Sequence, residues 1–293
     1  MHSIGKMRRH TVIKINKGSK VFITGAASGI GRATAMAMGR LGCRLFLTDI
    51  NSAGLEETVR MISQREGDVC MYRPLDIAQY DQVKAFANDI HCEFGPLDIL
   101  VNNAGISLYA LVEDMSHEHW QRVINVNLWG PIHGVECFLP EMIRAKKGHV
   151  VTVSSIAGLV GWPFHAAYSS AKWGLVGLSE VLRYDLMQHN IGVTVVCPGA
   201  VETPLKNSVE ILGIDPDSPK VKELKERFSR HAVSPERVAE LIVDAVERNR
   251  YLVVTSFDIR LLYFLKCHVS PLYHRVMIMF NRLIQDARSS GQN

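Results

Sequence analysis

Short β-branched apolar runs alternate with amphipathic helical stretches along this chain, and this alternation constrains its fold more than any other feature. The predicted strands are Lys20–Thr24, Arg44–Asp49, Val69–Arg73, Asp98–Val101, His149–Ser154, Gly192–Cys197 and Tyr251–Thr255. The predicted helices between them include Gly29–Leu41, Glu56–Gln64, Tyr80–Phe94 and Ser234–Glu247. Several strands are apolar on both faces, which indicates a sheet covered on both sides. The pattern predicts an α/β fold with a doubly wound parallel sheet of about seven strands flanked by helices.

No proline- or glycine-rich linker interrupts this pattern in the 293 residues. We therefore expect a single domain over residues 20–256, with a basic N-terminal extension at 1–19 and a C-terminal helical extension at 257–293. In the C-terminal extension, Ser270 and Pro271 are residue types that begin helices. Apolar residues then recur at helical spacing, namely Leu272, Val276, Met279, Phe280 and Leu283.

Composition excludes several classes of protein. With 47% hydrophobic and 21% charged residues, the chain is not intrinsically disordered. The six cysteines form no CxxC pair, so we expect neither a metal site nor a redox dithiol, and lone thiols suit a reducing compartment. No apolar run approaches the roughly 18 residues of a transmembrane span, and the first 20 residues lack the apolar core of a signal peptide. We expect a cytoplasmic protein.

Charge is distributed unevenly along the chain. Residues 1–20 carry six Lys or Arg and no acid, and residues 259–293 carry five Lys or Arg and one acid, so the body between them is mildly acidic. An acidic body does not favour binding of nucleic acid.

A glycine-rich turn follows the first predicted strand and opens the first predicted helix. Glycines permit positive φ and close approach of a ligand, while the helix N-terminus attracts a pyrophosphate. Asp49 ends the second strand 18 residues after Gly31, where a carboxylate can bind the ribose hydroxyls of an adenosine. A glycine turn of this kind also occurs in proteins without a cofactor, and Asp49 alone could be a surface aspartate. Together they predict a dinucleotide site that includes Gly25, Ser28, Gly29, Ile30, Gly31 and Asp49.

A second group of residues has the chemistry for proton transfer. Tyr168 and Lys172 are four residues apart, so on a helix they share a face, and a nearby ammonium lowers the pKa of a phenol from about 10. The tyrosine can then exchange a proton with an alcohol or ketone oxygen. Ser155 ends a buried strand at the side of a parallel sheet where ligands bind, so its hydroxyl can hold the substrate oxygen.

These motifs together resemble the short-chain dehydrogenase/reductase family. The chain has a TGxxxGxG turn (Thr24 to Gly31), an NNAG stretch (Asn102 to Gly105), an NVNL segment (Asn125 to Leu128), a YxxxK motif with an upstream serine, and a PGxxxT segment (Pro198 to Thr203). They occur in the family's order and span residues 20 to about 255. The resemblance implies a Rossmann fold that binds a nicotinamide dinucleotide.

The resemblance also implies roles for individual residues. Tyr168 would be the general acid/base, Lys172 would lower its pKa and hold the nicotinamide ribose, Ser155 would orient the substrate carbonyl, and Asn127 would support a water linked to Lys172. The remaining cofactor residues would be Asp76 and Ile77 at the adenine, Asn103, Ala104 and Gly105 at the adenosine side, and Pro198, Gly199, Val201 and Thr203 at the carboxamide. Asn103 could instead only brace strands, and Thr203 could only cap a helix.

Cofactor and substrate preferences follow from side-chain chemistry. Asp49 favours NAD over NADP because a carboxylate repels a 2′-phosphate. The segment between Ser155 and Tyr168 is apolar, with Trp162 and His165 as candidate substrate contacts, although His165 could simply pack against Trp162. A mobile lid is expected between Thr203 and Ser234. The sequence thus predicts interconversion of a secondary alcohol and a ketone on a hydrophobic substrate of steroid, long-chain or terpenoid type.

Two other functions remain open: a 3-oxoacyl reductase acting on acyl-carrier substrates, and a non-catalytic dinucleotide-binding module. For the assembly, family resemblance implies a homodimer or homotetramer that pairs helices corresponding to Glu113–Ala145 and Ala166–Gln188. An apolar stripe of Leu175, Leu178, Val181 and Leu182 supports this expectation. The C-terminal helix either packs against the protein's own body or a sister subunit, or closes over the active site as a lid, or lies peripherally on an anionic membrane surface, because its apolar face has basic flanks.

Overall fold

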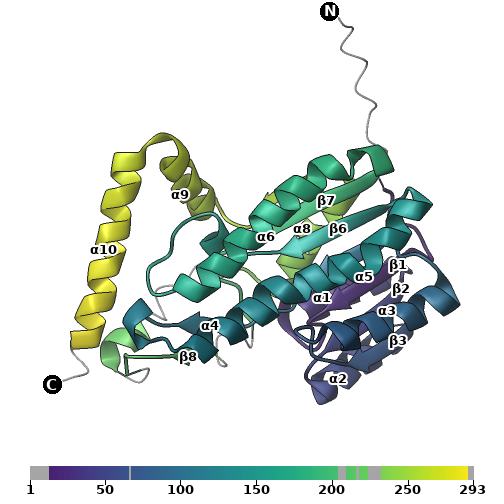
Figure 1. Ribbon diagram of the computed structural model, residues 1–293, viewed down its shortest axis with the longest axis horizontal. Coiled ribbons are helices and arrows are strands. Elements are labelled where there is room, and N and C mark those ends of the chain that lie inside the picture. Colours follow the sequence, from purple (N-terminus) through teal and green to yellow (C-terminus); the bar gives the residue numbers. More distant parts are fainter. Residues whose placement is uncertain (1–12, 66, 204–208, 216–217, 224–231, 290–293) are drawn as a thin grey trace, which may run out of the picture.

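The computed structural model describes residues 13–65, 67–203, 209–215, 218–223 and 232–289 (Figure 1). Seven strands form one parallel sheet in the order β3-β2-β1-β4-β6-β7-β9. They are β1 (Lys20–Thr24), β2 (Arg44–Asp49), β3 (Asp68–Pro74), β4 (Ile99–Asn102), β6 (Gly148–Val153), β7 (Ile191–Cys197) and β9 (Leu252–Val254). The predicted doubly wound parallel sheet is confirmed.

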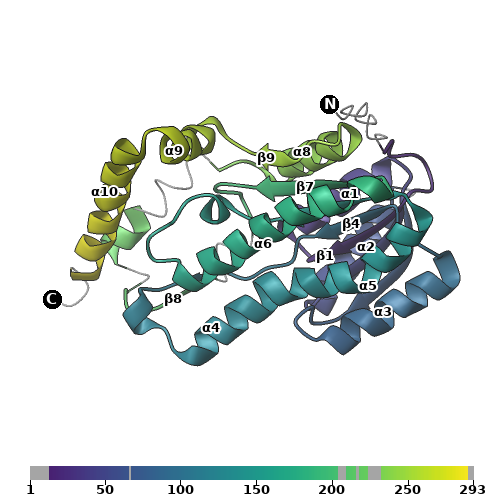
Figure 2. The same cartoon turned by 45° about the horizontal axis from the view of Figure 1, so that its top comes forward.

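Helices cover both faces of this sheet (Figure 2). Those of the main body are α1 (Gly29–Arg40), α2 (Ser52–Ser63), α3 (Tyr80–Phe94), α4 (His117–Ile124), α5 (Gly130–Ala145), α6 (Ala166–Asp185) and α8 (Pro235–Glu247). Strand residues alternate between two cores: Val21 and Ile23 pack with α1, α2 and α8, whereas Phe22 between them packs with α3 and α5. The period of two in a strand sends successive side chains to opposite faces, so both faces must be apolar.

The strand order reverses at β1, which pairs with β2 on one side and with β4 on the other. In open α/β sheets, the crevice for a ligand lies outside the carboxyl ends of the strands at such a switch point. The turns that follow β1, β4 and β6 therefore meet at one edge of the sheet, and the predicted site residues lie on them.

The long helix expected over Glu113–Ala145 is not continuous. Its segments are a 3₁₀ turn at Val112–Asp114, then α4, then a π-helical turn at Asn125–Trp129 and finally α5. The wider π turn inserts one extra residue into the helical repeat, and such turns are common at functional sites.

Only part of the predicted lid lies within the described residues. A short strand β8 (Glu210–Ile211) pairs in parallel with β5 (Leu108–Tyr109), outside the main sheet. Residues 204–208, 216–217 and 224–231, which include the beginning of the lid, lie outside the described ranges. Where the lid is described, it therefore lies against the segment that follows β4.

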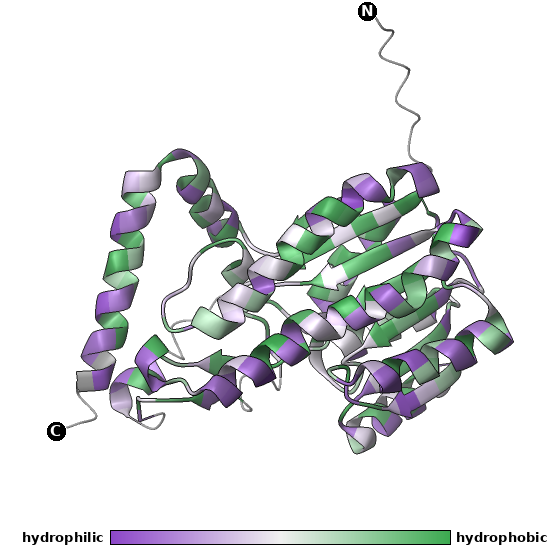
Figure 3. Ribbon diagram, in the orientation of Figure 1, coloured by the Kyte–Doolittle hydropathy of each residue, from purple (hydrophilic) through white to green (hydrophobic). Residues whose placement is uncertain are grey.

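Beyond β9 the chain forms two helices, α9 (Phe257–His268) and α10 (Ser270–Ser289), which we call the C-terminal arm. Figures 1 and 2 show α10 at the edge of the molecule, away from α1, α2 and α3. Apolar and polar residues alternate along α10 (Figure 3). Among the helices formed by the described residues, none has the length and apolar character needed to cross a membrane.

Candidate active site

The glycine-rich turn connects β1 to α1 at the switch point. Gly25 and Gly29 have φ of 69° and 52°, which side chains rarely adopt. A Cβ on Gly31 would overlap the carbonyl oxygen of Gly25, so this turn requires glycine there. Ser28 is the N-cap residue but makes no side-chain capping bond, and Ile30 packs on the core. The first N–H groups of α1 are thus presented at the carboxyl edge of the sheet, an arrangement that fits a pyrophosphate.

The carboxylate of Asp49 lies against this turn. One of its oxygens accepts the N–H of Ala27 at 2.9 Å, and the other accepts the N–H of Asn51 at 2.9 Å. Arg32 is engaged in the same region, because its guanidinium donates to the Ala27 oxygen at 2.5 Å and pairs with Glu57 at 2.6 Å. The turn therefore holds a fixed anionic group, while its nearest arginine is already paired.

The NNAG stretch is tied to the end of β1. Both Asn103 and Ala104 donate their backbone N–H to Thr24 Oγ1 at 3.0 Å, and the Asn103 side-chain amide donates to the Thr24 oxygen at 2.9 Å. Asn103 thus braces neighbouring strands, which is one of the two roles considered for it from the sequence. Asp76 accepts the N–H of Ala78 at 2.9 Å, and Ile77 is buried.

The structure brings Ser155, Tyr168 and Lys172 together. Ser155 follows β6, and Tyr168 and Lys172 lie one turn apart on α6. The Tyr168 hydroxyl is hydrogen-bonded to Ser155. Lys172 Nζ lies 5.6 Å from the centre of the Tyr168 ring and donates to the Val153 oxygen at 3.0 Å. Because Ser154 Oγ also donates to the Lys172 oxygen at 2.8 Å, α6 is fixed against the end of β6.

Burial, not the neighbouring ammonium, dominates the electrostatics of Tyr168 in the protein alone. Burial raises the pKa of Tyr168 to about 12, and the hydrogen bond from Ser155 acts in the opposite direction. The structure thus contradicts the expectation of a lowered Tyr168 pKa. Burial also lowers the pKa of Lys172 to about 8. At neutral pH, Tyr168 is protonated and Lys172 is still mostly charged.

Asn127 lies in the π-helical turn and is fully buried. Its amide makes two bonds of 2.9 Å to the backbone of Ile106, donating to the carbonyl and accepting the N–H. A Cβ on Gly105 would lie 2.7 Å from Asn127 Oδ1 and 3.4 Å from Lys172 Nζ. Gly105 thus leaves the space between Asn127 and Lys172 open.

The PGxxxT segment crosses the edge of the sheet between the glycine turn and Ser155. The Pro198 oxygen accepts the N–H of Ile156 at 2.8 Å, and the Gly199 N–H donates to Thr255 Oγ1 at 3.2 Å. At its other end, the methyl of Thr203 would lie 2.9 Å from a Cβ on Gly29. Val201 forms a β-bridge with Val233. The segment therefore spans from the predicted pyrophosphate position to the neighbourhood of Ser155.

The two candidate substrate contacts, His165 and Trp162, lie in different surroundings. His165 lies near Tyr168, with the two rings 6.0 Å apart, but its ring packs on Tyr109 at 4.1 Å and bonds to the Pro163 oxygen. The ring contacts of His165 are therefore with Tyr109 and Tyr168. Burial lowers the pKa of His165 to about 4, so the ring is neutral at physiological pH. Trp162 instead packs on Phe280 of α10, with ring centres 5.1 Å apart.

Sequence reasoning missed three kinds of residue around Tyr168. Tyr109 lies beside His165, buried enough that its pKa is raised, and Cys197 lies near Lys172 with a pKa raised by burial to about 12. In the arm, Phe280 was predicted only as part of the apolar face of the C-terminal helix, and neither it nor Tyr273 was assigned to the site, although both approach the loop after Ser155. No local motif marks such residues, since each comes from a segment distant in sequence.

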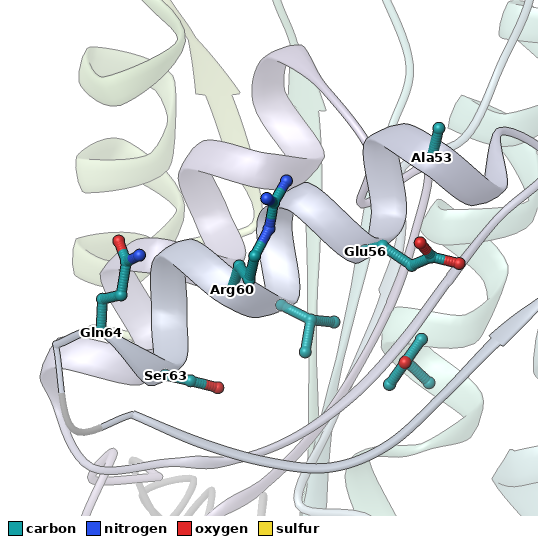
Figure 4. Close-up of a pocket in the computed structure, with 7 residues that line it drawn as sticks. Ala53, Glu56, Arg60, Ser63 and Gln64 are labelled. Atoms are coloured by element: carbon teal, nitrogen blue, oxygen red, sulfur yellow. The ribbon is translucent and has the colours of Figure 1, made fainter.

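A surface groove of about 780 Å³ lies beside α2, lined from α2 and β3 (Figure 4). Its lining residues are Ala53, Glu56, Val59, Arg60, Ser63, Gln64 and Tyr72. It contains none of the predicted site residues. Among the described residues, no cluster of His, Cys, Asp and Glu could hold a metal ion.

Residues 19–211 match the family model for short chain dehydrogenase, and the chain belongs to the short-chain dehydrogenase/reductase family. It is 34% identical over 227 residues to the 3-oxoacyl-[acyl-carrier-protein] reductase FabG of Thermotoga maritima, which covers 78% of this chain and 89% of that protein. It is also 34% identical over 245 residues to dehydrogenase/reductase SDR family member 7B of Bos taurus, covering 82% of this chain and 74% of the relative.

Solved structures agree with this assignment. The chain is similar to a short-chain dehydrogenase/reductase from Burkholderia phymatum crystallised with NAD, with a TM-score of 0.79 and 28% identity over 89% of this chain and 96% of that one. The protein is accordingly an oxidoreductase of a family that uses a nicotinamide dinucleotide. The C-terminal arm lies beyond the residues that the family model matches.

Proposed function

We propose that this protein interconverts a hydrophobic secondary alcohol and its ketone, with NAD as the preferred cofactor. The observation that carries the proposal is the cluster of Ser155, Tyr168 and Lys172 at the carboxyl edge of the sheet. A bound nicotinamide dinucleotide supplies or accepts the hydride. The three side chains supply the proton and orient the reacting oxygen.

Each residue has a distinct task in this proposal. Ser155 orients the substrate oxygen next to the Tyr168 hydroxyl, with which it shares a hydrogen bond. Tyr168 donates its proton to that oxygen when the ketone is reduced, and a phenol with a pKa of about 12 is protonated and ready for this step. Lys172 uses one proton to bond Val153, which leaves others for the ribose of the cofactor. Asn127 keeps the backbone at Ile106 in place. As the family resemblance implies, it would also support a water beside Lys172.

The remaining predicted residues would hold the cofactor. The turn of Gly25, Ser28, Gly29, Ile30 and Gly31 receives the pyrophosphate, and Asp49 the adenosine ribose. Because Arg32 is already bonded to Ala27 and Glu57, it offers little to a 2′-phosphate. This pairing supports NAD over NADP. Pro198, Gly199, Val201 and Thr203 would approach the carboxamide, and Asp76 and Ile77 the adenine.

Apolar surroundings support a hydrophobic substrate. Buried Leu108, Ala110, Val123 and Ala167 form a cluster against which Tyr168 packs, together with Leu212 of the lid. A purified-enzyme screen of hydrophobic alcohols and ketones with NAD and NADH tests the proposal. No turnover of any alcohol or ketone with either NAD(H) or NADP(H) would contradict it.

The similarity to FabG favours a second candidate, reduction of a 3-oxoacyl thioester. That function calls for a basic surface that docks an acidic carrier protein, whereas the body of this chain is mildly acidic. Side-by-side assay of a 3-oxoacyl thioester and a plain hydrophobic ketone separates the two candidates.

We expect a homodimer or homotetramer built on α6, with a corrected interface. Leu175 is fully buried within the single chain, so it belongs to the core and not to the predicted stripe. The exposed face of α6 carries Trp173, Val181 and Tyr184, which are 41%, 58% and 61% exposed. A Cβ on Gly177, between them, would touch nothing within 4 Å, which leaves room for a partner helix.

Light scattering at micromolar concentration should report a dimer or tetramer. Val181→Glu should shift the protein to a smaller species, because the new charge would be buried in the interface. Leu41→Glu, at the exposed apolar C-cap position that follows α1, is the matched control and should leave the mass unchanged. A wild-type monomer would count against the assembly.

We also propose that the outer side of the arm contacts an anionic membrane surface. Exposed apolar residues follow one side of α9 and the turn into α10, namely Phe257, Leu261, Phe264, Val269 and Leu272. Between Asp258 and Asp286 the sequence carries Arg260, Lys266, Arg275 and Arg282 and no acid. Apolar side chains with flanking bases fit an anionic lipid surface, where each base contributes about 1 kcal/mol.

Sedimentation with anionic liposomes tests this contact. The full chain should pellet at low salt, less so as salt is added, and Phe257→Ser/Phe264→Ser should weaken pelleting. Ile50→Ser, which replaces another exposed apolar residue, is the control. No pelleting at low salt would contradict the membrane contact and leave the arm with a packing role alone.

A further inference from the structure

The inner side of the C-terminal arm contacts the two segments that flank the catalytic cluster. From α9, Lys266 Nζ donates to the Leu159 oxygen at 2.6 Å and lies 3.6 Å from the centre of the Trp173 ring. From the first turn of α10, the Tyr273 hydroxyl accepts the N–H of Gly161 at 3.2 Å. These contacts reach the loop that connects Ser155 to Tyr168.

Farther along α10, Phe280 packs on Trp162 with ring centres 5.1 Å apart. In the last turn, Arg288 pairs with Glu113 at 2.8 Å and with Asp114 at 3.1 Å. Asp114 in turn lies against the described part of the lid, where a Cβ on Gly213 would overlap its carboxylate. Both ends and the middle of α10 are therefore attached beside the site.

The apolar stripe predicted for α10 is divided by this packing. Val276, Phe280 and Leu283 are half-buried and Met277 is buried, whereas Met279 is 53% exposed. The buried side of α10 is thus occupied by the protein's own loop. The C-terminal helix thus packs against the protein's own body, which is one of the possibilities considered for it. The side of the arm that packs in this way differs from the side of α9 that carries the exposed apolar residues.

The loop itself depends on outside support. Residues 156–165 contain Gly158, Gly161 and Pro163, and their backbone structure consists of the 3₁₀ turn Ile156–Gly158 and a single β-bridge from His165 to Ala110. Phe164 adopts a positive φ of 69°, which a bulky residue takes only where its surroundings hold it. The arm supplies contacts to three consecutive parts of this loop, at Leu159, Gly161 and Trp162.

We propose that the arm forms the outer wall of the substrate site and that Tyr273 and Phe280 position Trp162, so that they set the size of the substrate which the site admits. The inference rests on the proposed alcohol–ketone activity. Neither residue touches the reacting atoms, and both act through the loop. Without Phe280 the indole of Trp162 loses one ring that it packs on, and the wall can move outward.

Reduction of a small and a bulky ketone tests the proposal. We compare cyclohexanone and trans-2-decalone, with NADH, for wild type, Phe280→Ala and Tyr273→Phe. A hydrophobic pocket distinguishes ligands by about tenfold or more when its wall changes by a few methylenes. The ratio of kcat/KM for decalone over cyclohexanone should therefore rise about tenfold in Phe280→Ala and in the same direction, but less, in Tyr273→Phe, while kcat with cyclohexanone stays near the wild-type value.

Met279→Ala is the matched control, because Met279 adjoins Phe280 in sequence but is exposed. Phe280→Leu keeps an apolar side chain, and it replaces Phe280→Ala in the ketone comparison if Phe280→Ala does not fold. The proposal is wrong if the decalone/cyclohexanone ratio of kcat/KM in the Phe280 variant equals the ratio in the Met279→Ala control.

A second measurement separates the arm from the activity. Amide hydrogen exchange at Gly161 should be faster in Tyr273→Phe than in wild type, because the acceptor of that N–H is removed. If the wild-type enzyme reduces no ketone, the proposed function is wrong. If exchange at Gly161 is nevertheless faster in Tyr273→Phe, the attachment of the loop by the arm is still supported. If the exchange rate at Gly161 is the same in Tyr273→Phe as in wild type, the proposed attachment of the loop by the arm is wrong, whatever the activity.

Discussion

Replacing Tyr168 with phenylalanine is expected to lower turnover by about 100-fold or more, with binding of NADH retained. The change removes one hydroxyl, which is the proton donor of the proposed reaction, and proton transfer of this kind contributes about 10²–10⁴ in rate. The ring keeps its packing against the apolar cluster beside Ala167, so the fold should be unaffected. Steady-state kinetics and a fluorescence titration with NADH provide the two readouts.

The control for this substitution is Tyr72→Phe, which removes a phenolic hydroxyl from the exposed surface of β3. It should have wild-type activity. A Tyr168→Phe enzyme that keeps more than a few per cent of wild-type turnover would show that another group donates the proton.

Removing the charge of Asp49 is expected to abolish or reverse the preference for NAD(H). Wild-type enzyme should have the higher kcat/KM with NAD(H), because the carboxylate accepts the ribose hydroxyls and repels a 2′-phosphate. A hydrogen bond to a charged group contributes about 1.5–3 kcal/mol, and 1.4 kcal/mol is tenfold. The NAD(H)/NADP(H) ratio of kcat/KM should therefore fall by about tenfold or more in Asp49→Ala.

Asp49 also accepts the N–H groups of Ala27 and Asn51, so Asp49→Ala loosens the turn as well. Asp49→Asn keeps an acceptor and removes only the charge, and its ratio should fall too. Asp68→Ala, at the opposite end of the neighbouring strand β3, is the control. Wild-type preference for NADPH would show that the inference from Asp49 is wrong.

Local patterns predicted the elements of the fold well. The helix Tyr80–Phe94 has the predicted bounds, and Ser234 caps α8 by accepting the N–H of Arg237 at 3.1 Å. Periodicity and capping depend on neighbours within a few residues, so the sequence carries them directly. The same holds for Tyr168 and Lys172, whose spacing on one helix places them on one face.

Interruptions of local patterns were not predictable in this way. The π turn at Asn125–Trp129 divides a stretch that was expected to form one long helix. It is stabilised by tertiary contacts, among them the bonds of Asn127 to Ile106, which comes from the segment after β4. Likewise, only the packed chain showed that Leu175 is buried and that Val181 and Tyr184 are exposed.

By itself, the sequence determined the order of strands and helices, the glycine turn and the candidate residues of the site, because each follows from residues close together in the chain. Tertiary structure decided the direction in which the pKa of Tyr168 is shifted, since desolvation depends on everything packed around the phenol. It also decided that α10 lies against the loop of Trp162. Segments more than 100 residues apart find each other through matching surfaces, which no local spacing encodes.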